Sequence, residues 1–166
     1  MLIEKLKDRF GAGILSAQAV HGEEAITIDR DRAPEILRAL RGEPEFDFNL
    51  LADLTAVDWI ERKPRFDLVY NLSSLAQGHR LRVKIGLDGP EPWTHSAIEI
   101  WKAADWLERE CFDMFGVVFR GHPDLRRILL YDSFVGYPLR KDYPYNKRQS
   151  IVPEVDAVVH PVRPSR

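Results

Sequence analysis

The sequence has a single cysteine and no long apolar run, and each shortage excludes a class of protein. Because Cys111 has no second cysteine to pair with, the chain forms no internal disulfide. One thiolate also cannot hold an iron–sulfur cluster, which usually needs about four cysteines. No stretch approaches the ~20 apolar residues of a membrane-spanning helix, and the N-terminal MLIEKLKDRFG mixes acids with bases, unlike a signal or transit peptide. We therefore expect a soluble chain in a reducing compartment that reaches any membrane through a partner.

Sequence motifs for metals and phosphates are also missing. The five histidines are scattered without an HxH or HxxxH pair, which argues against a metal site. Gly11-Ala12-Gly13 follows a helical pattern and lacks the later glycine of a dinucleotide-binding loop, so we interpret it as a helix end and a turn. These absences predict a chain that binds no metal or flavin by itself.

The charge is nearly balanced overall but is divided unevenly along the chain. The formal net charge of −2 argues against a nucleic-acid or membrane-surface partner for the whole protein. Residues 116–166 hold nine Lys/Arg against five Asp/Glu, a net of +4, so residues 1–115 carry −6, and six of the eleven prolines lie in the last part. Such a proline-rich tail is typical of an extended segment. We therefore place a compact domain at 1–116 and an extended basic arm at 117–166.

Hydrophobic spacing predicts an α+β fold. Helical spacing indicates helices over 2–10 and 32–40, the second with Asp31 as its N-cap. The segments with strand patterns are residues 14–20, 25–28, 50–60, 65–75 and 81–87. The first two should form a hairpin and the last three an antiparallel meander, in which the almost wholly apolar 50–60 would be the central, doubly covered strand. The order αββαβββ, followed by a further helix, predicts a mostly antiparallel sheet with helices on one face.

A last helix is predicted before the arm. Capping-box patterns at 96–99 and 105–108 indicate a short helix, a bend near 103–105 and a firmer helix over 106–115. When residues are placed every ~100° around this helix, Phe112 lies in the middle of a charged arc that also holds Asp105, Glu108, Arg109 and Asp113. The chain's own tail or a partner protein would cover such a ring, and bare exposure is the third interpretation.

Glu110 is unusual in the opposite way, because the same wheel puts it on the side that should be buried. A half-buried carboxylate needs a cation or hydrogen-bond donors, and Arg126, Arg127 and Arg140 lie downstream. We predict a structural ion pair between Glu110 and Arg126 or Arg127. A role in proton transfer is the alternative.

The stretch ERECFDMFGVVFRGHPDLRRIL, residues 108–129, resembles the signature of the 30 kDa subunit of the proton-pumping NADH:quinone oxidoreductase, respiratory complex I. The positions that fit this signature are Glu108, Arg109, Glu110, Asp113, Met114, Phe115, His122, Arg126, Ile128 and Leu129. The stretches DLTAVDW (53–59) and YPLRKDYP (137–144) also resemble that family, and so does the αββαβββ order.

The resemblance implies a structural subunit without catalytic residues, metal or cofactor of its own, in a complex that couples electron transfer from NADH to quinone with proton translocation. FMN, iron–sulfur clusters and quinone would belong to other subunits. The chain would pack on the large cluster-proximal subunit, with other hydrophilic-arm subunits, on the cytoplasmic side of the cell membrane, peripherally and without nucleic acid. The arm would dock on that partner. Candidate partner contacts are Phe112, Tyr137, Arg140, Lys141, Asp142 and Tyr143.

Other interpretations remain open. Similar domains occur in membrane-bound hydrogenases and in ferredoxin-fed relatives. A stand-alone acid–base enzyme would use Glu108, Glu110, Asp113 and His122, but a helix spreads those three carboxylates around its circumference and keeps them from one substrate atom. Nucleic-acid binding by the basic tail is disfavoured because acids interrupt its charge.

Overall fold

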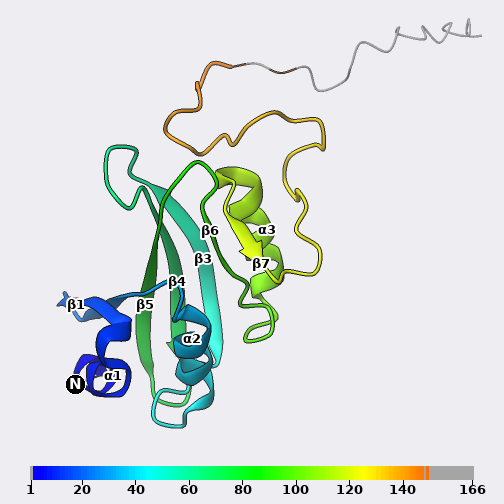
Figure 1. Ribbon diagram of the computed structural model, residues 1–166. Helices are drawn as coiled ribbons and strands as arrows, with labels where there is room; N and C mark the ends of the chain where they lie inside the picture. The colour runs from blue at the N-terminus through cyan, green and yellow to red at the C-terminus, as the bar shows by residue number, and fades with distance from the viewer. Residues whose placement is uncertain (1, 148, 150–166) are drawn as a thin grey trace, which may run out of the picture.

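Five strands form the sheet that organises the molecule in the computed structural model, which describes residues 2–147 and 149 (Figure 1). The strands are β1 (Ile14–Val20), β2 (Glu23–Ile28), β3 (Leu50–Asp58), β4 (Phe66–Ser74) and β5 (His79–Leu87). Their order across the sheet is β1-β2-β5-β4-β3. The hairpin β1–β2 and the antiparallel meander β3–β4–β5 are confirmed, and a parallel β2–β5 pair joins them.

The most fully buried strand is β4, not β3. β4 has a paired strand on each side and is buried at most of its positions, whereas β3 is the last strand of the sheet and its burial alternates. The prediction of a central strand at 50–60 was therefore wrong. Residues 50–60 are apolar for another reason, because α3 (Ala104–Phe115) packs on one face of β3. Leu54 and Ala56 on that face are buried, whereas Val57 on the opposite face is only half-buried.

The helices lie on one face of the sheet, as predicted. The others are α1 (Leu2–Phe10), which a short 3-10 turn (Gly11–Gly13) joins to β1, and α2 (Ala33–Gly42). A row of buried side chains crosses four neighbouring strands beneath them: Ile26, Val83, Tyr70 and Leu54. Leu6 of α1, Ile36 of α2 and Cys111 of α3 join the same core. One apolar core therefore positions all three helices.

The start of α2 differs from the prediction. Its N-cap residue is Arg32, which makes no side-chain capping bond. Asp29 has the role expected of Asp31, because its Oδ1 accepts the backbone N–H groups of Asp31 at 2.9 Å and Arg32 at 3.2 Å. The chain turns as soon as it leaves β2, so the aspartate nearer the strand stabilises the turn.

The predicted short helix after residue 96 does not form, and residues 98–100 are a turn. Ser96 therefore caps a turn and not a helix: its hydroxyl accepts the backbone N–H of Ile98 at 3.2 Å and donates to Glu108 Oε2 at 2.6 Å. Two short parallel strands, β6 (Trp93–His95) and β7 (Val118–Arg120), flank α3. α3 ends at Gly116 as predicted, with φ of 72°. Because β7 belongs to the body, the extended segment begins after Arg120 rather than at 117.

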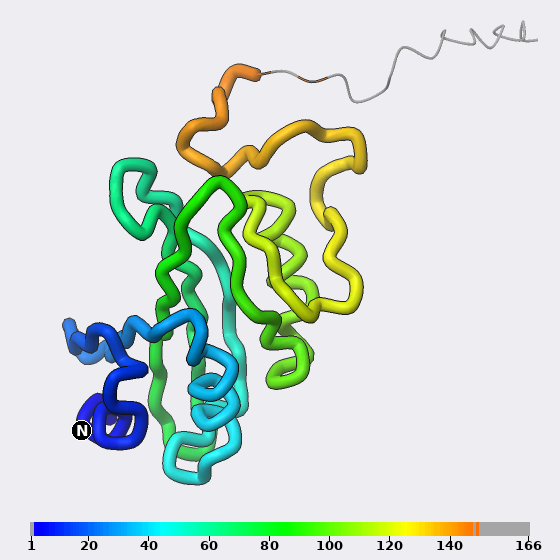
Figure 2. Tube along the Cα trace, viewed as in Figure 1, coloured from blue at the N-terminus to red at the C-terminus, as the bar shows by residue number. Residues whose placement is uncertain are grey.

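From 121 to 147 the chain contains only turns, bends and irregular backbone, and it crosses the side of α3 before returning across the top of Figure 2. We call residues 121–147 the arm from here on. The sequence predicts an extended arm beyond the compact domain, but residues 121–147 do not stand apart from that domain, because they are hydrogen-bonded to α3 and to the end of β3. Residue 148 and residues 150–166 of the predicted arm lie outside the described residues. Among the described helices, none has the length and apolarity needed to cross a membrane.

Candidate functional site

Asp113 is the strongest link between α3 and the arm. Its side chain is fully buried, and its Oδ1 accepts a hydrogen bond from Arg127 Nη1 at 2.6 Å. Its Oδ2 accepts three successive backbone N–H groups, at 3.1, 2.8 and 2.9 Å, from Ile128, Leu129 and Leu130. Burial alone raises the pKa of this carboxyl, but the donors outweigh burial and the pKa is lowered. The charged carboxylate therefore fixes the path of the arm beside the helix.

Two arginines of the signature region reinforce this link through backbone carbonyls. Arg127 Nη2 donates to the carbonyl oxygens of Phe134 at 3.0 Å and Gly136 at 3.3 Å. Arg109 of α3 donates in the other direction, to the carbonyl oxygens of Arg126 at 3.2 Å and Arg127 at 3.1 Å. Each guanidinium thus satisfies backbone acceptors in a segment without regular structure.

Three further signature residues fix the start of the arm or fill the core. The side chain of His122 is fully buried, and its Nε2 lies 3.2 Å from the carbonyl oxygen of Asp105, near the start of α3. Its Nδ1 accepts the backbone N–H of Asp124 at 3.1 Å. Met114 and Phe115 are buried in the core.

Glu108 is the second buried carboxyl of α3. Its Oε2 accepts the Ser96 hydroxyl and its Oε1 accepts the backbone N–H of Ala97, both at 2.6 Å. Burial raises the pKa of Glu108 to about 7. The buried hydroxyl of Tyr70 has no hydrogen-bond partner among the described residues, and burial together with the nearby Glu108 charge raises its pKa well above the usual value. Through its bonds to Ser96 and Ala97, Glu108 joins the middle of α3 to the loop that precedes the helix.

Glu110, in contrast, is exposed. The predicted ion pair with Arg126 or Arg127 was wrong, because Arg127 binds Asp113 and Arg126 pairs with Asp124 at 2.9 Å. In residues 2–147 and 149, Glu110 forms no ion pair.

The helical wheel failed because the chain covers part of the charged arc itself. The loop at 96–97 lies over Glu108, and the arm lies over Asp113. Phe112, on the same arc, is half-buried, and its ring meets Tyr137 edge to face with 6.5 Å between centroids. The chain's own tail therefore covers part of this ring and leaves the rest accessible.

A second attachment holds the later part of the arm at the end of β3. Arg65 binds the buried carboxylate of Asp58 with two hydrogen bonds, at 2.8 and 2.6 Å. These bonds keep the pKa of Asp58 well below its usual range. The same carboxylate accepts the backbone N–H of Lys141 at 2.8 Å, and Arg65 Nη1 binds Asp142 at 3.0 Å. The Asp58–Arg65 ion pair thus fastens two residues of the arm.

Arg140 closes the arm over the end of α3. Its Nε donates to the carbonyl oxygen of Phe115 at 2.5 Å, and burial lowers the pKa of its guanidinium. A Cβ at Gly116 would lie 2.6 Å from atoms of Tyr137 and Arg140. Glycine at this position therefore permits both the left-handed end of the helix and the close approach of the arm.

The six residues predicted to contact a partner differ in what they contact within this chain. Tyr137 and Arg140 contact α3, and Lys141 and Asp142 contact Asp58 and Arg65. Among the described residues, Tyr143 has no hydrogen bond or ring contact with α3 or β3: it stacks on Phe134 of the arm with 6.0 Å between ring centroids, and its hydroxyl accepts a hydrogen bond from Gln149, just beyond the arm, at 2.7 Å. All six candidates keep at least partial exposure: Phe112, Tyr137, Arg140, Lys141, Asp142 and Tyr143.

Sequence reasoning did not assign the structural role of four residues in this region: Asp58, Arg65, Tyr70 and Ser96. Asp58 lies within DLTAVDW, so the family resemblance contained a signal for it. Ser96 was noticed, but as a helix cap. Nothing local marks Arg65 or Tyr70, because their importance comes from segments that fold against them.

Two attachments hold the arm to the body: Asp113 binds Arg127 and the backbone of residues 128–130, and the Asp58–Arg65 pair binds residues 141 and 142. We call these two attachments the clasp. Glu108 and Asp113 face different segments, and each already accepts hydrogen bonds from its own chain. A surface groove of about 840 Å³ lies beside the β1–β2 and β4–β5 turns, and none of its lining residues belongs to the signature. In the part of the chain that the structure describes, no three His, Cys, Asp or Glu side chains are grouped as metal ligands.

These features define a small α+β domain that holds an irregular arm through two buried acids, Asp113 of α3 and Asp58 of β3. Comparison with known proteins gives the family. Residues 26–149 match the family described as respiratory-chain NADH dehydrogenase, 30 Kd subunit. The chain belongs to this family, which confirms the resemblance found in the sequence.

Relatives and solved structures agree with this assignment. The chain is 44% identical over 142 residues to an NADH-quinone oxidoreductase subunit of Citrifermentans bemidjiense, and the match covers 86% of this chain and 87% of the relative. It is 45% identical over 141 residues to the protein of the same name from Geobacter sulfurreducens, covering 84% and 86%. Among solved structures, the trypsin-resistant fragment (1–134) of Nqo5 superposes with a TM-score of 0.65 at 30% identity, covering 75% of this chain and 96% of that one. A chain of the archaeal membrane-bound sulfane sulfur reductase, at 23% identity and a TM-score of 0.76 over 87% of this chain and 85% of that one, shares the fold.

Proposed function

We propose that the chain is the structural 30 kDa subunit in the hydrophilic arm of a proton-translocating NADH:quinone oxidoreductase and supplies no catalytic residue or cofactor itself. The observation that carries this proposal is the use of Glu108 and Asp113, the two buried acids of the signature, as internal attachments. In this proposal FMN, the iron–sulfur clusters and quinone belong to other subunits. The chain supports electron transfer from NADH to quinone by holding a binding surface in shape.

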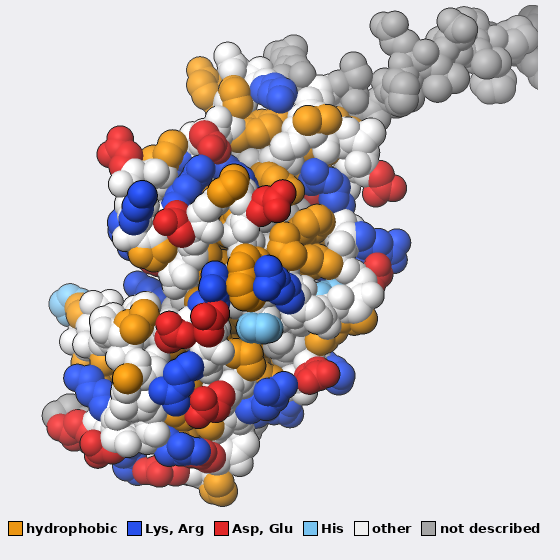
Figure 3. Space-filling view, viewed as in Figure 1, with side chains coloured by type: hydrophobic (Ala, Val, Ile, Leu, Met, Phe, Trp, Pro, Cys, Tyr) orange, Lys and Arg blue, Asp and Glu red, His pale blue; other side chains and the backbone are white. Residues whose placement is uncertain are grey.

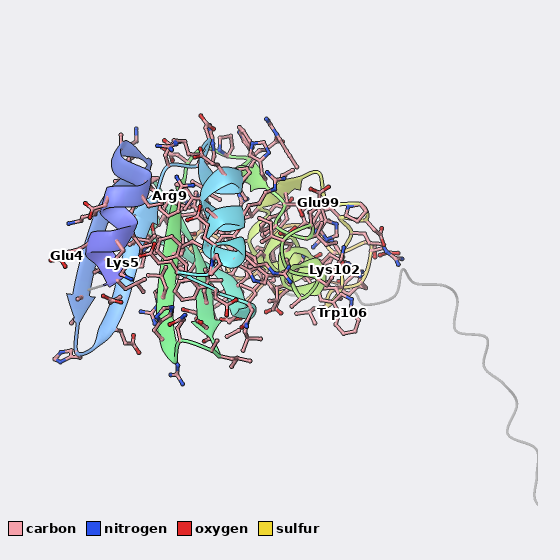
Figure 4. All side chains as sticks on the ribbon, turned by 90° about the horizontal axis from the view of Figure 1, so that it is seen from below. Glu4, Lys5, Arg9, Glu99, Lys102 and Trp106 are labelled. Atoms are coloured by element: carbon pink, nitrogen blue, oxygen red, sulfur yellow. The ribbon has the colours of Figure 1, made fainter. Side chains whose placement is uncertain are left out.

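That surface includes the outer side of this chain's own arm, residues 121–147. In this proposal the arm docks on the large cluster-proximal subunit at the cytoplasmic side of the membrane. Three apolar side chains of the arm are more than half exposed: Leu129 (63%), Val135 (66%) and Leu139 (52%). Tyr145 of the arm is fully exposed. Trp106, 70% exposed, points outward from α3 at the end of the molecule opposite to α1 (Figure 4). Exposed apolar side chains of this number beside one helix support a protein partner.

Co-purification tests the assignment. A tagged copy, isolated from detergent-solubilised membranes, should bring down the flavin- and cluster-bearing subunits that oxidise NADH. The purified chain alone should oxidise no NADH and contain no stoichiometric metal or flavin. A nickel–iron large subunit among the co-purified proteins would instead assign the chain to a membrane-bound hydrogenase, and metal bound to the isolated chain would contradict the structural role.

Charge placed on the arm tests the docking surface. Leu129→Asp and Leu139→Asp should each reduce the amount of the large cluster-proximal subunit that co-purifies, while thermal unfolding of the isolated chain stays unchanged because both side chains are exposed. Leu75→Asp is the matched control, since Leu75 is 73% exposed but lies at the β4–β5 turn. Equal loss of the partner in all three variants would show that the arm has no special role.

A further inference from the structure

Two arginines enclose one tryptophan on a part of the body that the clasp does not use. The ring of Trp93 in β6 has the guanidinium carbon of Arg30 4.0 Å from its centroid and that of Arg120 3.4 Å from it. His95 meets the same ring edge-on, with 5.6 Å between centroids. We call these four residues the arginine–tryptophan cluster. Near the centre of the face in Figure 3, Lys or Arg side chains lie on both sides of a hydrophobic one, with a histidine beside them.

The parallel pairing of β6 and β7 explains why these side chains point outward together. His95 is opposite Arg120 in the register, and the alternate positions, Thr94 and Phe119, are opposite each other and buried. Because side chains alternate along a strand, Trp93, His95 and Arg120 must face away from the core. Arg30 completes the cluster from the loop that follows β2.

The cluster carries more positive charge than its own chain neutralises. Arg30 Nε lies 3.1 Å from Asp31, which is mostly exposed, whereas Arg120 has no carboxylate within ion-pairing distance in the described residues. A guanidinium stacked on an aromatic face keeps its in-plane N–H groups free and loses side-chain freedom, so it is prepared to bind a carboxylate through two hydrogen bonds. The site is therefore ordered before any partner arrives.

We propose that the arginine–tryptophan cluster binds carboxylate side chains of a neighbouring protein in the assembled complex. A protein carboxylate is favoured over a small free anion because the cluster is open: neither the groove of about 840 Å³ nor that of about 370 Å³ is lined by its residues. A free anion would have few further contacts here, whereas a carboxylate on another protein is held by the rest of an interface. The inference rests on the proposed membership in a multisubunit complex, but it uses residues other than the arm.

Zero-length cross-linking tests this site in the assembled complex. Carbodiimide joins an amine to a carboxylate with which it is in contact, and arginine does not react, so the R120K variant places a reactive amine in the cluster. The expected product is a cross-link from position 120 to an Asp or Glu of another chain of the complex, identified by mass spectrometry. The R41K variant is the control, because Arg41 is exposed at the end of α2 and forms no ion pair among the described residues. Cross-links from position 120 only within its own chain, or none, would overturn the proposal.

Salt sensitivity provides a second measurement. The R120Q variant should dissociate from the complex about 2- to 5-fold more readily at low salt, as expected for loss of one interfacial ion pair. This difference should shrink as salt is raised, because salt screens the pair in the unmodified complex, while the R41Q variant behaves as the unmodified chain. Unchanged salt sensitivity in R120Q would contradict the inference. If the proposed function itself were wrong, the unmodified chain would recover no such complex at all, so the two failures are distinguishable.

Discussion

The carboxyl of Glu108 lies between the Ser96 hydroxyl and the Ala97 N–H and has no exposed surface. Burial raises its pKa to about 7 from a usual value of 4.5, so the folded chain holds this proton more tightly than the unfolded chain. The sign follows from linkage: the free energy of unfolding falls as pH rises from about 4.5 to about 7. Glu108→Gln keeps an acceptor for Ala97 and offers a donor to Ser96, so it should remove this fall.

Urea unfolding at pH 5 and pH 8 measures the effect. The variant should be more stable than the unmodified chain at pH 8 by up to ~3 kcal/mol, with a much smaller difference at pH 5. Glu110→Gln is the control on the same helix, because Glu110 is exposed, and it should follow the unmodified chain at both pH values. A Glu108→Gln variant that is less stable at pH 8 would show that the charged form is the one the fold requires.

Asp113 should be the residue whose loss most weakens the contact between α3 and the arm. Asp113→Ala leaves Arg127 and three backbone N–H groups without their acceptor in a buried position. Breaking a buried pair of this kind costs about 3–5 kcal/mol. Chemical denaturation gives the loss of stability, and hydrogen exchange should show faster exchange at Ile128, Leu129 and Leu130. Unchanged exchange at these three amides would contradict the assigned role.

At the scale of the elements, the arm is held at two separate places, and the second can be released alone. Arg65→Gln removes the guanidinium that neutralises Asp58 and binds Asp142. The expected cost is ~3 kcal/mol, with faster hydrogen exchange at the Lys141 amide, which donates to Asp58. The amides of 128–130 should stay protected, because Asp113 holds them.

Arg62→Gln is the matched control for this release. Arg62 lies in the same turn and pairs with Asp67, away from the arm. It should leave exchange at Lys141 unchanged. If both variants accelerate that exchange equally, the turn as a whole, and not the Asp58–Arg65 pair, fastens the arm.

The elements also show how far local sequence patterns reach. α1, the β1–β2 hairpin and the meander were predictable because their periodicity and turns lie within each segment. The parallel β2–β5 pair and the β6–β7 pair join residues that are far apart in the chain, and no local pattern marks them. The apolar run at 50–60 indicated burial correctly but could not say whether a strand or a helix provides it.

The candidate site was predictable in its location but not in its contacts. The family signature directed attention to α3 and the start of the arm, where the attachments lie. The wheel assumed that charged residues of α3 face water, so it placed Glu110 inside and Glu108 outside, the reverse of what the structure shows. α3 is covered on one side by the core and on another by the loop at 96–97 and the arm. A projection of the helix alone shows only the side that faces the core.

At the scale of the whole molecule, Phe112 distinguishes the stability of the chain from its assembly. The ring is half-buried against Tyr137, so Phe112→Ala should cost only about 1–2 kcal/mol in the isolated chain. The accessible part of the Phe112 ring lies beside the arm. In the Phe112→Ala variant, the amount of the large cluster-proximal subunit that co-purifies should therefore fall more than the loss of stability explains. Leu107→Ala, at another half-buried position on α3 that packs on the core, is the control for a purely structural loss. Equal effects on assembly would assign Phe112 to the chain's own packing.

The order of strands also determines when this protein can fold as it is made. β5 is the last of the five strands in the chain, yet it lies between β2 and β4. Leu87, its end, follows Ile28, the end of β2, by 59 residues, so at about 5–20 residues per second β2 waits roughly 3–12 s for its neighbour on the ribosome. During that time the unpaired edge of β2 and the apolar Ile26 and Ile28 are open to other nascent chains. We therefore expect the first hairpin to be the segment most prone to wrong pairing until Leu87 has emerged.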